Sequence, residues 1–333
     1  MITKDELEHY LYDADEEQLE ALYSEAREKT IKVYGKNIYI RGLIEFTNYC
    51  KNDCLYCGIR RSNSSLKRYR LEQSDIIDCA NEGYELGYRT FVLQGGEDLS
   101  FSDKDICDIV YNIKSLHNDV AVTLSIGEKE KTTYKAYFDA GADRYLLRHE
   151  TVDEEHYAKL HPEEMSLANR KRCLYDLRDI GFQVGCGFMV GSPYQNPDTL
   201  YQDLCFIDEL KPHMVGIGPF ISHKDTPFKD EANGTLKSTR ILIALLRLMN
   251  PRLLIPATTS LATIAPNGRE LGILSGANVV MPNLSPVRFR ELYALYDGKV
   301  CMGEEAAQCI NCIRERISNI GYEVIVDRGD YKA

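Results

Sequence analysis

Short apolar runs alternate with longer amphipathic segments along most of the chain. The longer segments carry their apolar residues at helical spacing, whereas the short runs have the length of strands. This pattern predicts eight strands, near residues 38–47, 89–94, 120–126, 143–148, 182–190, 213–218, 253–258 and 277–281. Helices are predicted at 74–87, 103–117, 130–140, 166–180, 198–210, 236–249 and 286–296.

The number and spacing of the strands predict an α/β fold, a (β/α)8 TIM barrel. Strands followed by a helix or loop at intervals of about 35 residues match the period of such a barrel. A doubly wound open sheet has the same alternation, but the count of eight favours a closed barrel. We expect a single domain, residues 1–333, with N-terminal helices at 1–35, a barrel core at 36–285 and a C-terminal helical tail at 286–333.

The N-terminal helical region begins with a capping pattern. Thr3 and Glu6 have capping-box spacing, and the leucines that follow recur at helical intervals up to residue 33. This segment is acidic and amphipathic, so it is neither a signal nor a transit peptide. A cytoplasmic location is therefore expected.

Composition and charge narrow the classes of partner. With 44% hydrophobic and 27% charged residues, the chain has the composition of a soluble globular protein. Its net charge of -11 argues against binding to nucleic acid or to an anionic membrane surface. No apolar run approaches the roughly 20 residues that span a bilayer.

Eleven cysteines are many for a protein of a reducing compartment, where clustered cysteines indicate metal binding or catalysis. Five stand alone in apolar segments and are predicted to be buried small hydrophobes: Cys79, Cys107, Cys173, Cys186 and Cys205. The other six form two groups, Cys50, Cys54 and Cys57 early in the chain and Cys301, Cys309 and Cys312 near its end.

The first group has the spacing C-x3-C-x2-C and directly follows the first strand. Three thiolates can bind three irons of a cubane cluster and leave the fourth iron open to another ligand. The alternatives are unrelated thiols or a structural zinc site. Zinc needs four protein ligands, and no nearby cysteine or histidine completes this set. Barrel enzymes place their sites at the C-terminal ends of strands, which is where these cysteines fall.

Other unusual groups also follow predicted strands. They are Gly95-Gly96-Glu97-Asp98 after the second strand, Arg148-His149-Glu150 after the fourth and Thr258-Thr259 after the seventh. A closed barrel would bring these distant segments together at one mouth.

The C-x3-C-x2-C motif with Tyr56 before its last cysteine resembles the signature of the radical S-adenosylmethionine (SAM) superfamily. The resemblance implies a 4Fe-4S cluster whose open iron binds the amino and carboxylate groups of SAM. One electron from the cluster then cleaves SAM into methionine and a 5′-deoxyadenosyl radical. The protein's part is to position the sulfonium beside the cluster.

The same resemblance implies a SAM site. Gly95-Gly96-Glu97 would hold the methionine ammonium, Glu150 the ribose hydroxyls and Arg170 the methionine carboxylate. Gly187 to Gly191 would lie beside the adenine, with Met189 in place of the usual isoleucine; Tyr194 stands where a glutamate is frequent. The alternatives without a cofactor are an ordinary turn for the glycines and surface positions for Glu150 and Arg170. The implied cofactor residues are Tyr56, Gln94, Gly95, Gly96, Glu97, Glu150, Arg170 and Met189.

The second cysteine group, with the spacing C-x7-C-x2-C, predicts a possible second iron-sulfur cluster, 2Fe-2S or 4Fe-4S. An adventitious thiol site, or zinc with a distant fourth ligand, is the alternative.

Five segments together resemble the HydE family of FeFe hydrogenase maturases, from about residue 35 onward. They are CLYCGIRRSNSSLKRYRL, VLQGGED, RYLLRHET, IPATTSL and the second cysteine group. Biotin and methylornithine synthases share the barrel and the first motif but not this C-terminal pattern. Gln94-Gly95-Gly96-Glu97-Asp98 stands where the family usually has Gln-Ser-Gly-Glu-Asp. The resemblance implies radical attack on the sulfur of an iron-cysteine precursor that carries carbonyl and cyanide ligands, with HydG and HydF as partner maturases. A ferredoxin or flavodoxin would donate electrons.

The expected barrel lining agrees with an anionic substrate. Arg41, Leu43 and Glu45 share one face of the first strand, as Arg148 and Glu150 do of the fourth. An arginine inside a barrel needs a partner or a ligand, and Arg41 paired with Glu45 in the barrel floor is the structural alternative. The resemblance implies substrate contacts from Arg41, Arg148, Thr258, Thr259, Met281 and Tyr293.

Two rival functions remain open. One is a radical mutase or sulfur-insertion enzyme acting on a small organic substrate, and the other is a non-catalytic iron-sulfur carrier. The carrier predicts that no 5′-deoxyadenosine forms with SAM and a reductant.

Overall fold

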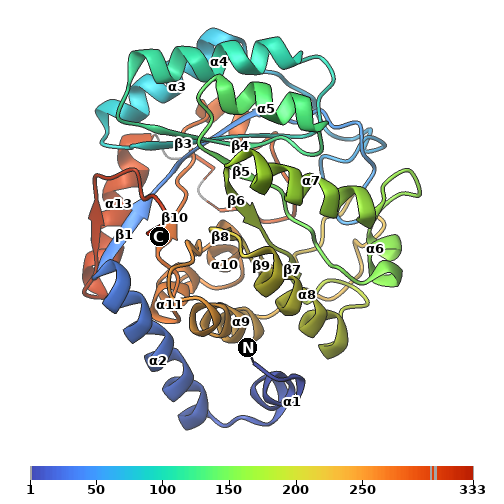
Figure 1. The fold of residues 1–333 in the computed structure, drawn as a ribbon, viewed down its shortest axis with the longest axis vertical. Helices are drawn as coiled ribbons and strands as arrows, with labels where there is room; N and C mark the ends of the chain where they lie inside the picture. The colour runs from blue at the N-terminus through green and yellow to red at the C-terminus, as the bar shows by residue number, and fades with distance from the viewer. Residues whose placement is uncertain (1, 301, 304–305, 333) are drawn as a thin grey trace.

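A closed parallel β-barrel surrounded by helices forms the body of the molecule (Figure 1). The computed structural model describes residues 2–300, 302–303 and 306–332. The strands of the barrel wall are β1 (Asn37–Ile40), β2 (Gly42–Thr47), β3 (Thr90–Gly95), β4 (Ala121–Ser125), β5 (Arg144–Leu146), β6 (Gln183–Cys186), β8 (Met214–Val215) and β10 (Val279–Val280).

The hydrogen-bond ladder confirms closure. Strands β2, β3, β4, β5, β6 and β8 pair in that order, all in parallel, and β10 pairs with β1. Isolated parallel bridges from Met214 to Leu254 and from Pro256 to Val279 join the two arcs. The predicted strand at 253–258 is therefore reduced to these bridges, because Pro256 has no N–H to extend the ladder. The TIM barrel prediction is confirmed.

Three predicted strands are divided in the structure. The first becomes β1 and β2 at Arg41, where the chain changes its main pairing from β10 to β3. The fifth becomes β6 and β7 (Met189–Val190), and the sixth becomes β8 and β9 (Gly218–Pro219), which pairs with β7 in a separate two-stranded sheet.

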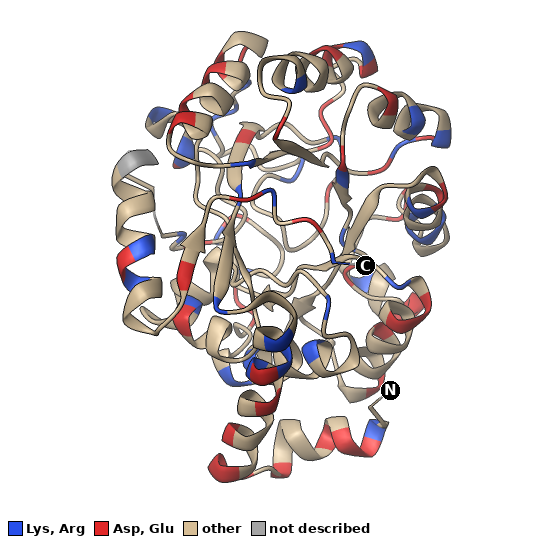
Figure 2. Cartoon of the chain, turned by 60° about the vertical axis from the view of Figure 1, so that its left-hand side comes forward, with Lys and Arg blue, Asp and Glu red and all other residues tan. Residues whose placement is uncertain are grey.

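The outer helices agree with the predicted periodicity. They are α3 (Gln73–Glu85), α4 (Asp103–Leu116), α5 (Lys131–Asp139), α7 (Leu167–Ile180), α8 (Pro197–Leu210) and α9 (Leu236–Met249). Three short helices were not predicted: α6 (Glu154–Leu160), α10 (Thr259–Ile264) and α11 (Gly268–Leu274). Figure 2 shows the charged residues spread over this outer layer.

The predicted helix at 286–296 is wrong for most of its length. Only α12 (Val287–Arg290) is helical. The carbonyl of Leu292 accepts a hydrogen bond from Asn48 Nδ2, and the carbonyl of Leu295 accepts one from the Gly58 N–H. These carbonyls bind the cysteine loop instead of continuing a helix.

The N-terminal region is helical as predicted, in three pieces: α1 (Lys4–Glu8), a π-helical turn η1 (His9–Asp13) and α2 (Glu16–Tyr34). Thr3 and Glu6 form the predicted capping box. Of the five isolated cysteines, Cys79, Cys173 and Cys186 are buried as expected, whereas Cys107 and Cys205 are only half-buried.

The segment after residue 285, expected to be helical, also contains a strand. Helix α13 (Ala306–Asn319) leads into β11 (Glu323–Ile325), which pairs in parallel with β1 beside the N-terminal end of the barrel. The chain then crosses the barrel floor, where Asp330 Oδ1 lies 2.7 Å from Nη2 of the fully buried Arg144. Arg328 binds Asp330 and Asp143 on the same floor.

The ion pair between Arg144 and Asp330 on the barrel floor predicts that acid destabilises the folded protein. Burial by itself would raise the pKa of Asp330, but Arg144 and Arg328 hold it at about 2. Since the folded pKa is lowered, the stabilisation is present above about pH 4 and is lost as pH falls towards 2. We expect Asp330→Asn to lower the free energy of unfolding by about 1–3 kcal/mol at neutral pH, discounted because Asp330 is 39% exposed. Thermal denaturation checks this, and Asp139→Asn, in an exposed pair with Lys135, should change little. Equal melting temperatures for wild type and Asp330→Asn would contradict the assignment.

Candidate functional site

The three clustered cysteines lie on a loop that follows β2 and is shaped by two polar side chains. Asn48 Nδ2 donates hydrogen bonds to the carbonyls of Lys67 and Leu292. The Arg68 guanidinium donates to five loop carbonyls, those of Asn48, Ile59, Arg60, Arg61 and Asn63. Because so many loop carbonyls bind this one guanidinium, Arg68 determines the shape of the loop.

The cysteine sulfurs face a shared, largely buried space. Burial raises the pKa of each thiol, to about 12 for Cys57, and the neighbouring cysteine sulfurs raise the pKa of Cys54 and Cys57 further. The Glu97 N–H donates to Cys50 Sγ at 3.4 Å, as is usual around iron-sulfur ligands. No three His, Cys, Asp or Glu side chains in the described part of the chain are spaced to hold one metal ion. The donor set therefore fits a multi-iron cluster better than a single zinc ion, and the bound metal would keep the thiols deprotonated.

Because Arg68 sets the shape of the loop, its replacement should weaken metal binding. We expect Arg68→Met to lower iron affinity by roughly 10–100-fold, the usual effect of losing a group that orients metal ligands. Iron bound per chain after anaerobic reconstitution with limiting iron measures this. Lys67→Met, next to it and exposed, is the matched control. Iron content equal to wild type in Arg68→Met would show that the loop holds its shape without the guanidinium.

Two glycines allow Glu97 to sit against the cysteine loop. A Cβ on Gly96 would lie 2.2 Å from the Tyr49 carbonyl oxygen and 2.7 Å from Cys50 Cβ. A Cβ on Gly127, whose φ is +81°, would lie 2.1 Å from the Glu97 carboxylate. The end of β3 and the turn after β4 thus enclose this carboxylate beside Cys50.

The Glu97 carboxylate is held by an ammonium and a backbone amide. Lys51 Nζ lies 3.0 Å from Oε2, and the Glu128 N–H donates to Oε1 at 3.1 Å. The geometry thus already accommodates an amino group at this carboxylate, which is the kind of group that the superfamily resemblance implies for it.

Glu150 and Arg170 are buried, which excludes the alternative that they are surface charges. Arg170 Nε donates to Glu128 Oε1 at 2.6 Å, and Nη1 donates to the Arg148 carbonyl. Glu150 Oε2 accepts from Arg148 Nη2 at 3.0 Å. The two residues therefore belong to one charged network at the ends of β5 and α7.

Tyr56, within the cysteine loop, contacts a histidine. Its hydroxyl is 3.2 Å from His161 Nε2, and His161 Nδ1 is 3.0 Å from the Tyr157 carbonyl. A carbonyl only accepts, so Nδ1 carries the proton and Tyr56 donates to Nε2. Burial and then Arg170 lower the pKa of His161 to about 3, which keeps it neutral. Met189 packs in the same apolar group as Tyr56.

Arg41 faces the barrel interior without the predicted structural partner. Glu45 instead pairs with Lys299 Nζ at 2.6 Å and accepts from Asn283 Nδ2 at 2.7 Å. Arg41 Nη1 donates to Met214 Sδ, while its buried Nε and Nη2 have no hydrogen-bond partner among the described residues. Burial, and then nearby Arg144, hold the pKa of Arg41 well below its ordinary value. The Arg41–Glu45 pair considered from the sequence is therefore not formed.

The other predicted substrate residues divide into two groups. Tyr293 is buried, and its hydroxyl accepts from Gln94 Nε2 at 3.3 Å, so these two meet inside the barrel. Thr258 Oγ1 lies 2.9 Å from Ser260 Oγ, whereas the Thr259 hydroxyl accepts from Arg269. Met281 packs with the apolar residues of the floor. The structure thus brings Gln94 and Tyr293 together, whereas Met281 packs with a separate apolar group.

The second cysteine group is only partly described. Cys309 and Cys312 lie three residues apart on α13, the first buried and the second exposed. Cys301 lies outside the described residues, so the second cluster stays a prediction.

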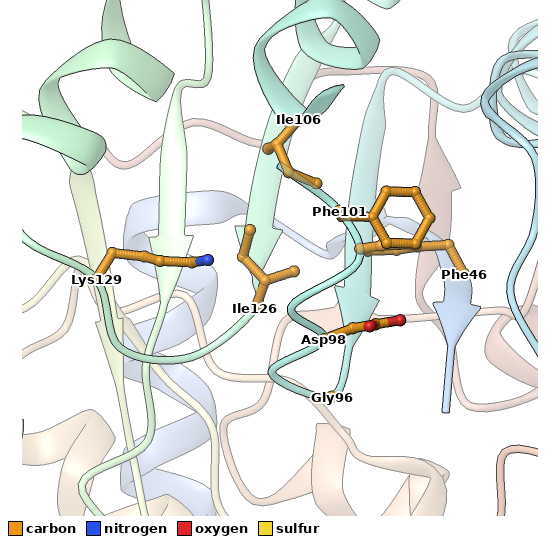
Figure 3. A pocket seen from close by; sticks show the side chains of 7 residues that line it. All are labelled: Phe46, Gly96, Asp98, Phe101, Ile106, Ile126 and Lys129. Carbon is orange, nitrogen blue, oxygen red and sulfur yellow. The ribbon is translucent and has the colours of Figure 1, made fainter. Parts of the chain in front are cut away.

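The hollows around the site differ in size. The small pocket of Figure 3, lined by Phe46, Gly96, Asp98, Phe101, Ile106, Ile126 and Lys129, has a volume of about 10 Å³, room for little more than a water molecule. A larger one of about 380 Å³ runs from Lys51 to Met165, whose Sδ lies 3.8 Å from Cys54 Sγ. The larger hollow therefore lies beside the cysteine loop.

Sequence reasoning missed four charged or polar residues of this region: Lys51, Glu128, His161 and Lys299. Lys51 adjoins Cys50, and that adjacency was a usable signal. The other three reach the site from separate loops, and nothing in their local pattern distinguishes them. Within the described residues, no helix combines the length and apolar character needed to cross a bilayer.

Comparisons with known proteins agree with this geometry. The model of the Radical SAM superfamily matches residues 44–207. The chain is 45% identical to the FeFe hydrogenase maturase subunit HydE of Thermotoga maritima over 94% of its own length and 89% of the relative's. It is 27% identical to 3-methylornithine synthase of Methanosarcina acetivorans, covering 97% and 90%. The crystal structure of methylornithine synthase PylB superposes with a TM-score of 0.85 at 26% identity, covering 98% of this chain and 94% of that one.

Proposed function

The chain belongs to the radical SAM superfamily and, within it, to the HydE family of FeFe hydrogenase maturases, and from this we propose that it helps to build the di-iron centre of such a hydrogenase. Enzymes of this superfamily bind a 4Fe-4S cluster and SAM, and the chain is a radical SAM enzyme. The observation that carries the proposal is the contact of Cys50 with the Gly96–Glu97 turn, in a chain so similar to a hydrogenase maturase.

Cys50, Cys54 and Cys57 would hold the cluster, which when bound supplies the electron that cleaves SAM to methionine and a 5′-deoxyadenosyl radical. Glu97 would bind the methionine ammonium in place of Lys51, and Arg170 the carboxylate. Glu150 would hold the ribose, with Met189 and Tyr56 on the apolar side. The buried, neutral His161 accepts the hydrogen bond of the Tyr56 hydroxyl through Nε2. That hydroxyl proton is therefore directed at His161 and away from the cofactor.

The substrate would bind deeper in the barrel. Among the described residues, two buried nitrogens of Arg41 and one of Arg148 have no hydrogen-bond partner, so a ligand with acceptor groups would satisfy them. An iron-cysteine complex carrying carbonyl and cyanide ligands has this anionic character. Thr258, Thr259, Met281 and Tyr293 would complete its surroundings, and the radical would attack the cysteine sulfur.

We also propose partners and a location, from the resemblance to the HydE family. We expect HydG and HydF to supply the precursor and receive the product, and a ferredoxin or flavodoxin to reduce the cluster in the cytoplasm. Cys301, Cys309 and Cys312 would hold a second, accessory iron-sulfur cluster.

Two experiments test the proposed function. The reconstituted, dithionite-reduced protein should convert SAM to 5′-deoxyadenosine. If no 5′-deoxyadenosine forms, the non-catalytic iron-sulfur carrier is the function that fits. Expressed in a strain that lacks its own HydE, the chain should restore hydrogenase activity. Failure to restore it, together with turnover of a small organic substrate such as an amino acid, would favour the mutase or sulfur-insertion enzyme instead.

A further inference from the structure

The turn after β5 has an unusual backbone conformation at the proposed ribose-binding residue. Glu150 has a φ of 65°, in the left-handed region that residues other than glycine rarely adopt. Such a conformation persists only where surrounding contacts fix it. The contacts around residues 149–152 therefore determine where the Glu150 carboxylate points.

His149 joins this turn to the glycine turn proposed to lie beside the adenine. The Gly187 N–H donates to His149 Nδ1 at 3.3 Å, and the Gly187 carbonyl accepts from the Glu150 N–H at 3.0 Å. Because Nδ1 accepts, the proton of the neutral ring is on Nε2. The ring is fully buried and contacts Phe188 and Phe206, so it cannot turn without disturbing both.

Asp203, on α8, holds the other side of the same turn. Its Oδ1 accepts from the Val152 N–H at 2.7 Å and lies 3.5 Å from His149 Nε2. Both side chains have no exposed surface. One carboxylate oxygen thus fixes the backbone two residues beyond Glu150 and lies beside His149 Nε2, which makes no hydrogen bond among the described residues.

Burying the Asp203 carboxylate beside His149 costs free energy of folding, which indicates a functional reason for the pair. Asp203 Oδ2 has no hydrogen-bond partner among the described residues, and an apolar pair of similar volume would avoid burying a carboxylate. The hydrogen bonds and the ion pair that the two residues form among the described residues involve none of Cys50, Cys54 and Cys57, so their contacts act on the nucleoside side of the site.

We propose that His149 and Asp203 are positioning residues that hold the Glu150 turn and the Gly187 turn in register for the nucleoside half of SAM. This inference rests on the proposed function. It separates the site into a methionine half, set by Glu97 and Arg170, and a nucleoside half, set by this pair.

The test compares the two halves in the cluster-reconstituted full chain. Asp203→Ala and His149→Phe should weaken binding of 5′-deoxyadenosine by about tenfold, the usual scale for a group that orients a ligand-binding residue. Binding of methionine, measured separately by anaerobic calorimetry, should change by less than about twofold, since no methionine contact is altered. Asp203→Asn keeps the Oδ1 acceptor and should restore most of the nucleoside affinity. Asp198→Ala, on the exposed side of the same helix, is the control.

Each outcome has a separate meaning. Equal weakening of both ligands with a lowered melting temperature would overturn the proposal in favour of a purely structural pair. Unchanged nucleoside binding in Asp203→Ala would also overturn it. The alanine variant is not needed if it does not fold, because Asp203→Asn and His149→Phe can then be compared. If Asp203→Asn binds the nucleoside as weakly as His149→Phe does, the Oδ1 contacts of Asp203 do not position the site and the proposal is overturned. Wild-type protein that binds neither SAM nor 5′-deoxyadenosine would instead defeat the proposed function, whatever the variants do.

Discussion

Cys54→Ala should abolish the formation of 5′-deoxyadenosine from SAM. Cys54 Sγ lies 3.8 Å from Sδ of Met165, which lines the 380 Å³ hollow, and the pKa of its thiol is raised well above the ordinary value by burial and by Cys57 and Cys50. Two remaining thiols would not hold a cluster with one open iron in this space. Chromatographic detection of 5′-deoxyadenosine after anaerobic reduction measures the loss, and iron content and the visible absorbance of the cluster should fall with it.

Cys107→Ala is the matched control for that loss. Cys107 is half-buried on α4 and has no place in the site, so its removal should leave cleavage unchanged. If Cys54→Ala still cleaved SAM at the wild-type rate, the cysteine loop would not be the cluster site. Reduced cleavage in both variants would indicate general damage by cysteine loss.

Gly96→Ala should be almost as severe, although it removes no ligand. The new methyl group would lie 2.2 Å from the Tyr49 carbonyl oxygen, which is backbone and cannot rotate away, and 2.7 Å from Cys50 Cβ. The loop must move to relieve this overlap, and a misplacement of about 1 Å at a reacting centre costs on the order of 100-fold in rate. We expect SAM cleavage to fall by that factor, with loss of part of the iron.

Gly303→Ala provides the control for Gly96→Ala. A Cβ at Gly303 meets nothing within 4 Å, so the substitution tests only the loss of backbone freedom. Both variants should keep a melting temperature near that of the wild type. Full cleavage activity in Gly96→Ala would mean that the turn and the cysteine loop are not in contact during the reaction.

Much of the fold was predictable because the barrel repeats a simple pattern. Seven of the eight predicted strands form, and the outer helices lie close to their predicted bounds, since periodicity and capping reflect local forces. The incorrect predictions lie where tertiary contacts, and not the local sequence, determine the backbone conformation. Pro256 prevents a strand that hydrophobicity predicted, and Leu292 and Leu295 give their carbonyls to the cysteine loop instead of to a helix.

The candidate site was predictable where its residues follow strands. Cys50, Glu97 and Glu150 fall at strand ends in the sequence, and the barrel brings them to one mouth. Asp203 and Lys299 could not be found in this way, because a carboxylate on an amphipathic helix and a lysine in a loop ordinarily face solvent. Only the three-dimensional structure reveals that both side chains are turned inwards.

The closed floor of the barrel has a consequence for how the protein is synthesised. Arg144 emerges from the ribosome with β5, but its partner carboxylate on Asp330 and the strand β11 come after every strand of the barrel wall. Until residues 323–330 are made, the floor guanidinium has no ion-pair partner and β1 has an open edge. A nascent chain stalled before residue 323 should therefore be sensitive to protease and prone to aggregation, even though its barrel wall is complete.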